Sequence, residues 1–336
     1  MAGGPSTPAL AAAVSGAGGL GFLGAGYRTV DAVRADIAAT RALTDRPFGV
    51  NVFALVDGTP GDPAAIAGYA ARLAGEAARA GVELGEPRFE DDGFAAKTEA
   101  LIVDPVAVVS FTFGLPPREV VDRLHAAGSE VWITVTSPAE ARAAALLEPD
   151  ALIVQGVEAG GHRGVFVDDE RASDLTLLAA LQLVGEAVSL PLVATGGLTT
   201  GPAIGAVMVA GAAAAQVGSA YLRTPEAGTS DAQRAATATD TPTALTRAFS
   251  GRTARGIVNR LLTEHTEAAP RAYPEVHHLF TPLRAHGRSV GDADLINLWA
   301  GQAHALAPEL PAGELTRQLA ADARAAVARA HAWLGD

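Results

Sequence analysis

Residues 151–164 read ALIVQGVEAGGHRG, an apolar run that ends in a loop rich in glycine. The apolar run is typical of a buried strand, and four glycines follow it before the stretch ends. Glycine lets the backbone approach a ligand closely, and His162 lies among these glycines. Because imidazole has the side-chain pKa nearest neutrality, His162 is a candidate proton acceptor. The alternative interpretation is a solvent-facing histidine in a turn.

On both sides of this stretch, strand-like and helical patterns alternate along the chain, which predicts a parallel sheet. Short connections between so many units favour a closed (β/α)₈ barrel, the TIM barrel, over an open sheet. The predicted strands are 21–23, 48–53, 106–112, 131–135, 151–155, 192–195 and 214–217. The predicted helices are 9–14, 29–43, 63–80, 117–127, 138–147, 174–188, 200–210 and 315–334.

This count gives seven strands, one fewer than a barrel of eight. The chain enters a helix directly after Met1 to Gly4, where such a barrel has its first strand. We therefore expect strand one to lie upstream of this start or to be missing, unless one of the helical stretches hides a strand. A segment rich in Ala, Thr, Asp and Pro follows residue 222. We expect residues 1–222 to form the barrel, 223–300 an inserted, mostly helical cap lobe, and 301–336 C-terminal helices that return to the barrel.

Composition excludes several classes of protein. Charged residues make up 18% of the chain and hydrophobic residues 49%, which is typical of a folded globular protein. A net charge of −12 argues against nucleic-acid binding, which needs clustered Lys and Arg. There is no cysteine, so thiolate chemistry is excluded. No stretch resembles a transmembrane helix or a signal peptide, and we expect a cytoplasmic protein without a membrane partner.

Two loops offer bare backbone N–H groups where TIM barrels hold phosphate, after the last two strands. These loops contain Gly196 and Gly197, and Gly218 and Ser219. Amides also stand at or near strand ends, and they suit the heteroatom edge of a flavin or nucleobase. They are Asn51, Gln155 and Gln216. Ser110, Phe111 and Phe113 are candidates for a substrate wall, with core packing as the alternative. Glu158 is a candidate to orient His162. No spacing indicates a metal site.

The chain resembles the nitronate monooxygenases, once called 2-nitropropane dioxygenases, which are FMN-dependent (β/α)₈ barrels. Eight stretches in matching order carry the resemblance: AGGPST at 2–7, AGGLG at 17–21, GVNVF at 49–53, VSFTFGLP at 109–116, QGVEAGGHRG at 155–164, ATGG at 194–197, QVGS at 216–219 and LWAGQ at 298–302. Members of the family usually have a strand ahead of the MAGG sequence, and this chain lacks it.

The resemblance implies FMN as the cofactor and His162 as the catalytic base. It implies FMN contacts at Asn51, Gln155, Gly160, Gly161, Gly196, Gly197, Gln216, Val217, Gly218 and Ser219. The implied reaction converts an alkyl nitronate or nitroalkane, such as propionate 3-nitronate, and O₂ to a carbonyl compound and nitrite. The flavin supplies the electron chemistry, and the protein supplies orientation and charge.

Two alternatives stay open from the sequence. One is an FMN-dependent enoyl-thioester reductase that uses NAD(P)H, because such enzymes share the EAGGH core of this stretch. The other is a non-catalytic FMN-binding protein, against which His162 argues. An acidic barrel with an inserted lobe is often a homodimer, and a homodimer is the expected oligomeric state.

Overall fold

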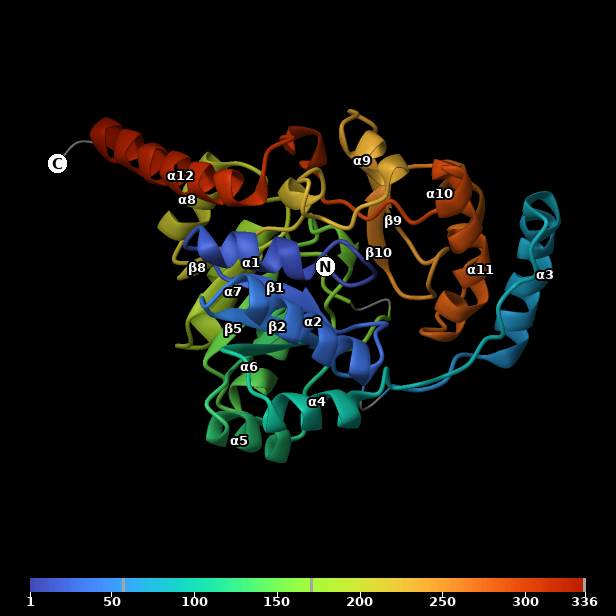
Figure 1. The fold of residues 1–336 in the computed structure, drawn as a ribbon, viewed down its shortest axis with the longest axis horizontal. Coiled ribbons are helices and arrows are strands. Elements are labelled where there is room, and N and C mark those ends of the chain that lie inside the picture. The colour runs from blue at the N-terminus through green and yellow to red at the C-terminus, as the bar shows by residue number, and fades with distance from the viewer. Residues whose placement is uncertain (56–57, 170–171, 335–336) are drawn as a thin grey trace.

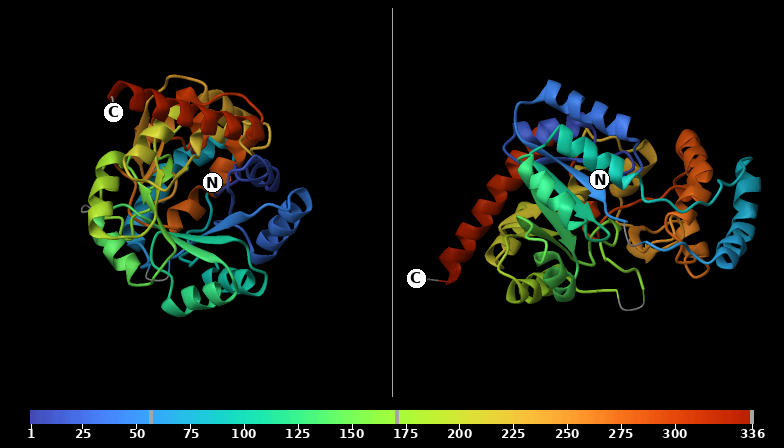
Figure 2. Two further views of the ribbon diagram at one scale, coloured as in Figure 1. Left: turned by 90° about the vertical axis from the view of Figure 1, so that its left-hand side faces the viewer. Right: turned by 90° about the horizontal axis from the view of Figure 1, so that it is seen from below.

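The computed structural model describes residues 1–55, 58–169 and 172–334. Seven parallel strands form one curled sheet, with helices on its outside (Figure 2). Its strands are, in spatial order, β1 (Gly21–Gly24), β2 (Phe48–Phe53), β3 (Val108–Thr112), β4 (Glu130–Val135), β5 (Ala151–Gln155), β7 (Leu192–Thr195) and β8 (Ala214–Gln216). All seven predicted strands are confirmed, with ends that differ by two residues at most.

Strands β2, β3, β4, β5 and β7 are largely buried on both faces, as expected for a parallel sheet covered by helices, whereas β8 at the edge is not. Every residue of β5 is buried, and Val50, Phe111 and Ile133 are fully enclosed in the same core cluster. Within the described ranges no ladder joins β8 back to β1. The N-terminal residues lie at this opening: a Cβ added to Gly24 would be 2.9 Å from Ala2 Cα, and one added to Gly218 would be 3.5 Å from Met1 Sδ.

Helices cover the outside of the sheet: α1 (Pro8–Gly16), α2 (Val30–Leu43), α4 (Phe94–Val103), α5 (Arg118–Ala126), α6 (Pro138–Ala145), α7 (Leu177–Ala187), α8 (Gly201–Val209) and α12 (Ala312–Leu334). Several begin with a hydroxyl cap, as the sequence predicts; Thr7 and Ser137, for example, each accept a backbone N–H and precede a proline. α12 packs closely along α8, since a Cβ at Gly201 would lie 2.3 Å from Asp322 Cβ. No helix in the described ranges is long and apolar enough to cross a bilayer.

A second body of structure lies at the carboxyl ends of the barrel strands. It contains α9 (Asp231–Thr237), β9 (Thr243–Thr246), β10 (Ala254–Ile257), α10 (Arg260–His265) and α11 (Glu275–Val290), with short 3₁₀ turns at η1 (Ser219–Tyr221), η2 (Ala293–Leu295) and η3 (His304–Leu306). Its strands were not predicted. They form an antiparallel sheet in the order β6-β10-β9, in which β6 (Gly161–His162) comes from the glycine-rich loop.

The long helix α3 (Pro63–Ala80) comes from the barrel part of the sequence but packs against α11 (Figure 1). Tyr69 and Leu73 of α3 join Phe249 and Phe280 in a second hydrophobic cluster. Tyr69 also donates its hydroxyl to the carbonyl of Ala248, at 2.7 Å. α3 lies at the end of the molecule opposite α12. The body beside the barrel is therefore assembled from two separate parts of the chain.

Candidate active site

His162 lies where the barrel meets the second body. Strand β6 holds its backbone opposite Ala254 of β10. Three aromatic rings surround the imidazole: the ring centroids of Phe113, Tyr273 and Trp299 lie 5.8, 5.5 and 5.5 Å from it. Phe113 follows β3, whereas Tyr273 and Trp299 come from the second body. The sequence pattern singled out Phe113 but not the other two rings.

Ser250 holds the imidazole of His162 in place. The Ser250 Oγ lies 2.8 Å from His162 Nε2 and 3.2 Å from the carbonyl oxygen of Arg252. When the Ser250 proton goes to that carbonyl, Ser250 accepts from His162 Nε2 and the lone pair of the ring is on Nδ1; when it goes to the ring, the lone pair is on Nε2. Nothing in the sequence near residue 162 pointed to Ser250, because 88 residues separate the two.

The surroundings of His162 keep the imidazole neutral. Burial is the main reason that its pKa is lowered from 6.5 to about 3. The guanidinium groups of Arg252 and Arg284 act in the same direction, against an opposing effect of Asp168. A neutral imidazole can accept a proton through the ring nitrogen that carries its lone pair.

Gln155 shapes the loop that carries His162. Its amide oxygen accepts from Arg163 Nη1 and from the backbone N–H of Gly164, both at 2.8 Å. Its amide nitrogen donates to the carbonyl of His162 at 3.1 Å. One amide N–H of Gln155 remains for a ligand.

Glu158 does not orient His162, contrary to the sequence-based hypothesis. Its carboxylate accepts the backbone N–H of Leu177 at 3.0 Å, at the first turn of α7, where negative charge is favourable. The loop is held from the other side by residues 300–302. A Cβ on Gly160 would lie 2.4 Å from Ala300 C, and the backbone N–H of Gln302 donates to the carbonyl of Glu158.

The loops after β7 and β8 present backbone N–H groups, as the sequence predicts for an anion site. Gly196 and Gly197 have φ values of +120° and +68°, which L side chains rarely adopt. Within the described ranges, the N–H groups of Gly196, Gly197 and Gly218 make no backbone hydrogen bond outside the regular elements. Ser219 accepts the backbone N–H of Gly301 at 2.8 Å, which leaves its hydroxyl proton for a ligand.

Gln216 and Val217 complete the second of these loops. Gln216 is exposed, and its carbonyl accepts from Thr195 Oγ1 at 3.0 Å. Val217 is partly buried against the core. On the other side of the glycine-rich loop, Gly161 has φ +76° and open space around its Cα, since no atom lies within 4 Å of the position that a Cβ would take. The loops of β5, β7 and β8 thus lie at one end of the barrel.

The other predicted side chains separate into those at the site and those in the barrel core. Asn51 Nδ2 donates to Ser110 Oγ and Thr112 Oγ1, both at 2.9 Å, so its amide oxygen is the group left for a ligand. Ser110 is buried, and Phe111 is fully enclosed against Phe94 in the barrel core. Phe113 differs, because its φ of +84° turns the chain at the strand end and places its ring beside His162.

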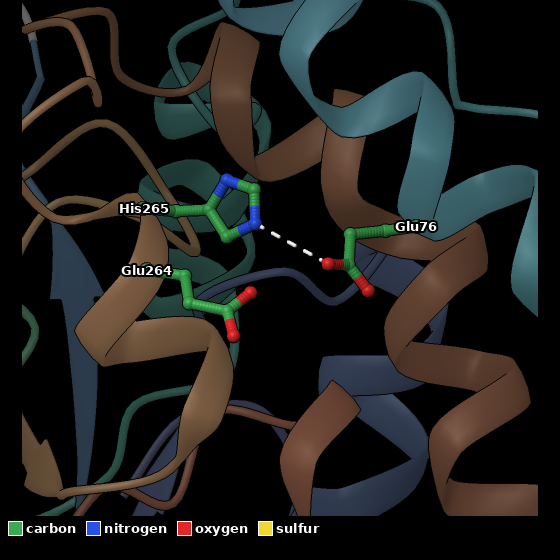
Figure 3. A group of neighbouring side chains, drawn as sticks. All are labelled: Glu76, Glu264 and His265. Carbon is green, nitrogen blue, oxygen red and sulfur yellow. Dashed lines mark hydrogen bonds and ion pairs between the residues drawn. The ribbon is translucent and has the colours of Figure 1, made fainter.

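One group of side chains has a composition that could suit a metal ion: Glu76, Glu264 and His265 (Figure 3). The carboxylate of Glu76 already accepts from both terminal nitrogens of Arg260, at 2.8 and 2.9 Å, and pairs with Arg79. These cations lower the pKa of Glu76 to about 2, with Arg260 the largest cause. The group is therefore an ion-pair cluster that ties α3 to α10, and two guanidinium groups occupy the carboxylate that a metal would need.

A curled parallel barrel with a histidine among the loops at the carboxyl ends of its strands defines a TIM-barrel type of enzyme, since these loops carry the chemistry in such barrels. The nitronate monooxygenase family model matches residues 1–322. The chain belongs to this family, and it is an oxidoreductase.

Individual relatives agree with this assignment. The chain is 39% identical to a nitronate monooxygenase of Pseudomonas aeruginosa, over 96% of this chain and 94% of the relative. It is 37% identical to one of Paraburkholderia phytofirmans, over 94% and 88%. Among solved structures, a nitroalkane oxidase from Streptomyces ansochromogenes matches with a TM-score of 0.95 and 50% identity, over 98% of this chain and 96% of that one. FabK from Thermotoga maritima shares the fold, with a TM-score of 0.77, 24% identity and coverage of 99% and 93%.

Proposed function

We propose that the chain is an FMN-dependent enzyme that oxidises alkyl nitronates, such as propionate 3-nitronate, with O₂ to a carbonyl compound and nitrite. The observation that carries the proposal is the buried, neutral His162, enclosed by Phe113, Tyr273 and Trp299. Membership of the nitronate monooxygenase family supports the substrate class.

The residues present fit FMN. The N–H groups of Gly196, Gly197 and Gly218 and the hydroxyl of Ser219 suit its phosphate. The free amide oxygen of Asn51 and the remaining N–H of Gln155 suit the polar edge of the ring. FMN would supply the electron transfer between the substrate and O₂. The glycines, including Gly160 and Gly161, would let the loop after β5 lie close to the ring.

The chain's own residues would position and deprotonate the substrate. The unprotonated ring nitrogen of His162 would take the proton from the carbon that bears the nitro group when a neutral nitroalkane binds, and Ser250 would hold the ring in place. With a nitronate, that proton is already absent, and His162 would orient the substrate instead. Phe113, Tyr273 and Trp299 would exclude water from this region.

The first experiment is the visible absorbance of the purified holoenzyme under anaerobic conditions. Loss of the flavin bands on adding propionate 3-nitronate, but not on adding NADH or NADPH, would support the proposal. Bleaching only by a nicotinamide would favour the enoyl-thioester reductase. A protein that takes up FMN and reacts with none of these would favour the non-catalytic binding protein, and a protein that takes up no FMN would contradict all three.

A variant separates catalysis from binding. We expect His162→Asn to retain FMN and to lose nitrite formation by about 100-fold or more when a neutral nitroalkane is the substrate, because no base remains. Unchanged turnover in this variant would remove His162 from the mechanism.

A further inference from the structure

Two arginines whose positive charge acts on His162 form no ion pair with a described carboxylate: Arg252, which is buried, and Arg284, which is partly buried. The first, Arg252, is 7% exposed, and its guanidinium carbon lies 4.2 Å from the centre of the Phe113 ring and 6.0 Å from that of Tyr273. Its Nε and one terminal nitrogen donate to the carbonyls of Arg163 and Val165. The other terminal nitrogen makes no hydrogen bond to a described residue. Arg252 is therefore oriented by neutral partners, and one of its donors remains available.

The second, Arg284 on α11, belongs to the same body as Arg252, and its guanidinium carbon lies 5.8 Å from the centre of the Phe280 ring. It donates to His277 Nδ1 and to the carbonyl of Phe249, both at 3.3 Å, while its Nε is buried without a partner among the described residues. The His277 ring stacks on Tyr27 at 4.0 Å, and the Tyr27 hydroxyl accepts from Tyr273 at 2.9 Å. Arg284 is therefore connected to Tyr273, which contacts His162.

The charge of this region is unbalanced. No described carboxylate forms an ion pair with Arg252 or Arg284, and the carboxylate with the largest effect on Arg252, Asp168, is bound by Arg247 at 3.2 Å. Burial lowers the pKa of Arg284 to about 10, so this group stays a cation at neutral pH. Buried cations without counter-charges are unfavourable, and a ligand that brings the missing negative charge is favoured. A nitronate brings one negative charge, whereas the charges of two guanidinium groups act on His162.

We propose that Arg252 and Arg284 determine substrate specificity by selecting nitronates that carry a second anionic group, a carboxylate, over uncharged alkyl nitronates. The inference rests on the proposed function, because it assigns the nitronate to the side of His162. A guanidinium matches a carboxylate with two parallel N–H donors, which an ammonium does not. The nitronate would lie at His162, the carboxylate would meet the free terminal nitrogen of Arg252, and Arg284, whose terminal nitrogens already donate to His277 and Phe249, would contribute its positive charge.

The test compares two substrates that differ in one charge: propionate 3-nitronate and the nitronate of 3-nitropropanamide. Nitrite formation is measured with the wild-type holoenzyme and with Arg252→Gln, Arg284→Gln and Arg252→Lys. We expect the wild type to prefer the carboxylate in kcat/KM by about 10-fold or more. Each Gln variant should lose about 30-fold in kcat/KM for the carboxylate, mainly through KM, and less than about 3-fold for the amide. Arg252→Lys should recover part of the loss.

The amide substrate serves as the folding control, because a misfolded variant loses both activities. Arg288→Gln, an exposed change one turn along α11, is the matched control and should leave the preference intact. Equal losses for both substrates, or a wild type without a preference for the carboxylate, would overturn the inference.

A binding measurement distinguishes failure of this inference from failure of the proposed function. Succinate places two carboxylates at the spacing of the dianionic nitronate, and butyrate has only one. Fluorescence of Trp299, whose ring lies 5.5 Å from His162, reports their binding. We expect succinate to bind about 10-fold or more tightly than butyrate, and this difference to disappear in Arg252→Gln. If succinate binds in this way but no nitronate is oxidised, the dianion site stands and the proposed function fails. If nitronates are oxidised without a charge preference, the proposed function stands and the inference fails.

Discussion

Replacing Lys97 by methionine tests how a buried ion pair behind the site holds the residues that enclose it. Lys97 is the only lysine of the chain and is 2% exposed. Its ammonium lies 2.6 Å from one oxygen of Asp92, and the other Asp92 oxygen accepts the backbone N–H of Tyr27 at 2.9 Å. Tyr27, with φ +64°, in turn accepts the hydroxyl of Tyr273 beside His162. The ion pair therefore fixes a strained turn that carries part of the site.

Lys97→Met leaves the Asp92 carboxylate buried without its cation. Removing one partner of a buried ion pair costs about 3–5 kcal/mol of the free energy of unfolding. Burial already raises the pKa of Asp92 above its ordinary value, and Lys97 opposes that rise. In the variant the folded pKa rises further, so the folded state binds a proton that the unfolded state releases. Stability is then lost as the pH rises from the unfolded pKa through the folded one.

Urea unfolding at pH 5 and pH 8 measures this pH-dependent loss of the free energy of unfolding. We expect the loss in Lys97→Met to reach about 3–5 kcal/mol at pH 8 and to be smaller at pH 5, where the carboxyl is more fully protonated. Asp92→Asn in the Lys97→Met background removes the unpaired charge and should recover part of the stability and most of the pH dependence. A loss below about 1 kcal/mol at pH 8, the level of an exposed pair, or an equal loss at both pH values would refute this reasoning.

Four further predictions concern the site itself. Gly160→Ala should reduce retained flavin and nitrite formation severely, because its Cβ would lie 2.4 Å from the backbone of residue 300; Gly161→Ala, with φ +76° but open space, should have a smaller effect in the same assays. Ser250→Ala should lower kcat by about 10–100-fold with little change in KM, since general base catalysis depends on orientation, while Ser250→Thr keeps the hydroxyl and should retain more activity. Ser219→Ala should weaken FMN binding by about 10-fold in a fluorescence titration, the effect of about one lost hydrogen bond. Because the pKa of His162 is lowered to about 3, the acid limb of kcat/KM assigned to this group should lie below pH 5; a limb near pH 6.5 would contradict the burial of the ring.

The sequence predicted the barrel well, because the parallel strands are nearly continuous apolar runs and most helices begin at a hydroxyl cap. It missed α4, whose N-cap is Gly93 in the left-handed conformation with no side-chain cap bond. It also missed β9 and β10, which read as an irregular segment. β9 and β10 pair with each other, but β10 also pairs with β6, about 90 residues earlier in the chain, and local patterns carry no information about such a partner.

The residues of the candidate site also divide into those that the sequence could predict and those that it could not. Residues at strand ends could be found from the sequence, because all carboxyl ends of a parallel barrel meet at one face. Ser250, Tyr273 and the two arginines could not, since they come from the second body and reach His162 only through tertiary packing. Phe111 is an error of the opposite kind, because it was a candidate for the substrate wall but alternation along β3 places it in the core. The positive φ of Phe113 brings the next aromatic ring to the site.

The two bodies have different parts in the proposed chemistry, and this division explains the distribution of charge. The barrel loops offer backbone N–H groups and amides, which are neutral and suit a cofactor that most members of a family would share. The second body supplies Ser250, Arg252, Tyr273 and Arg284, which surround His162 with cations and rings. The charged groups that act on His162 come from the second body, which has its own hydrophobic cluster and the Glu76–Arg260 ion pairs. Substrate charge preference in this fold can therefore vary while the residues proposed to hold the cofactor stay the same.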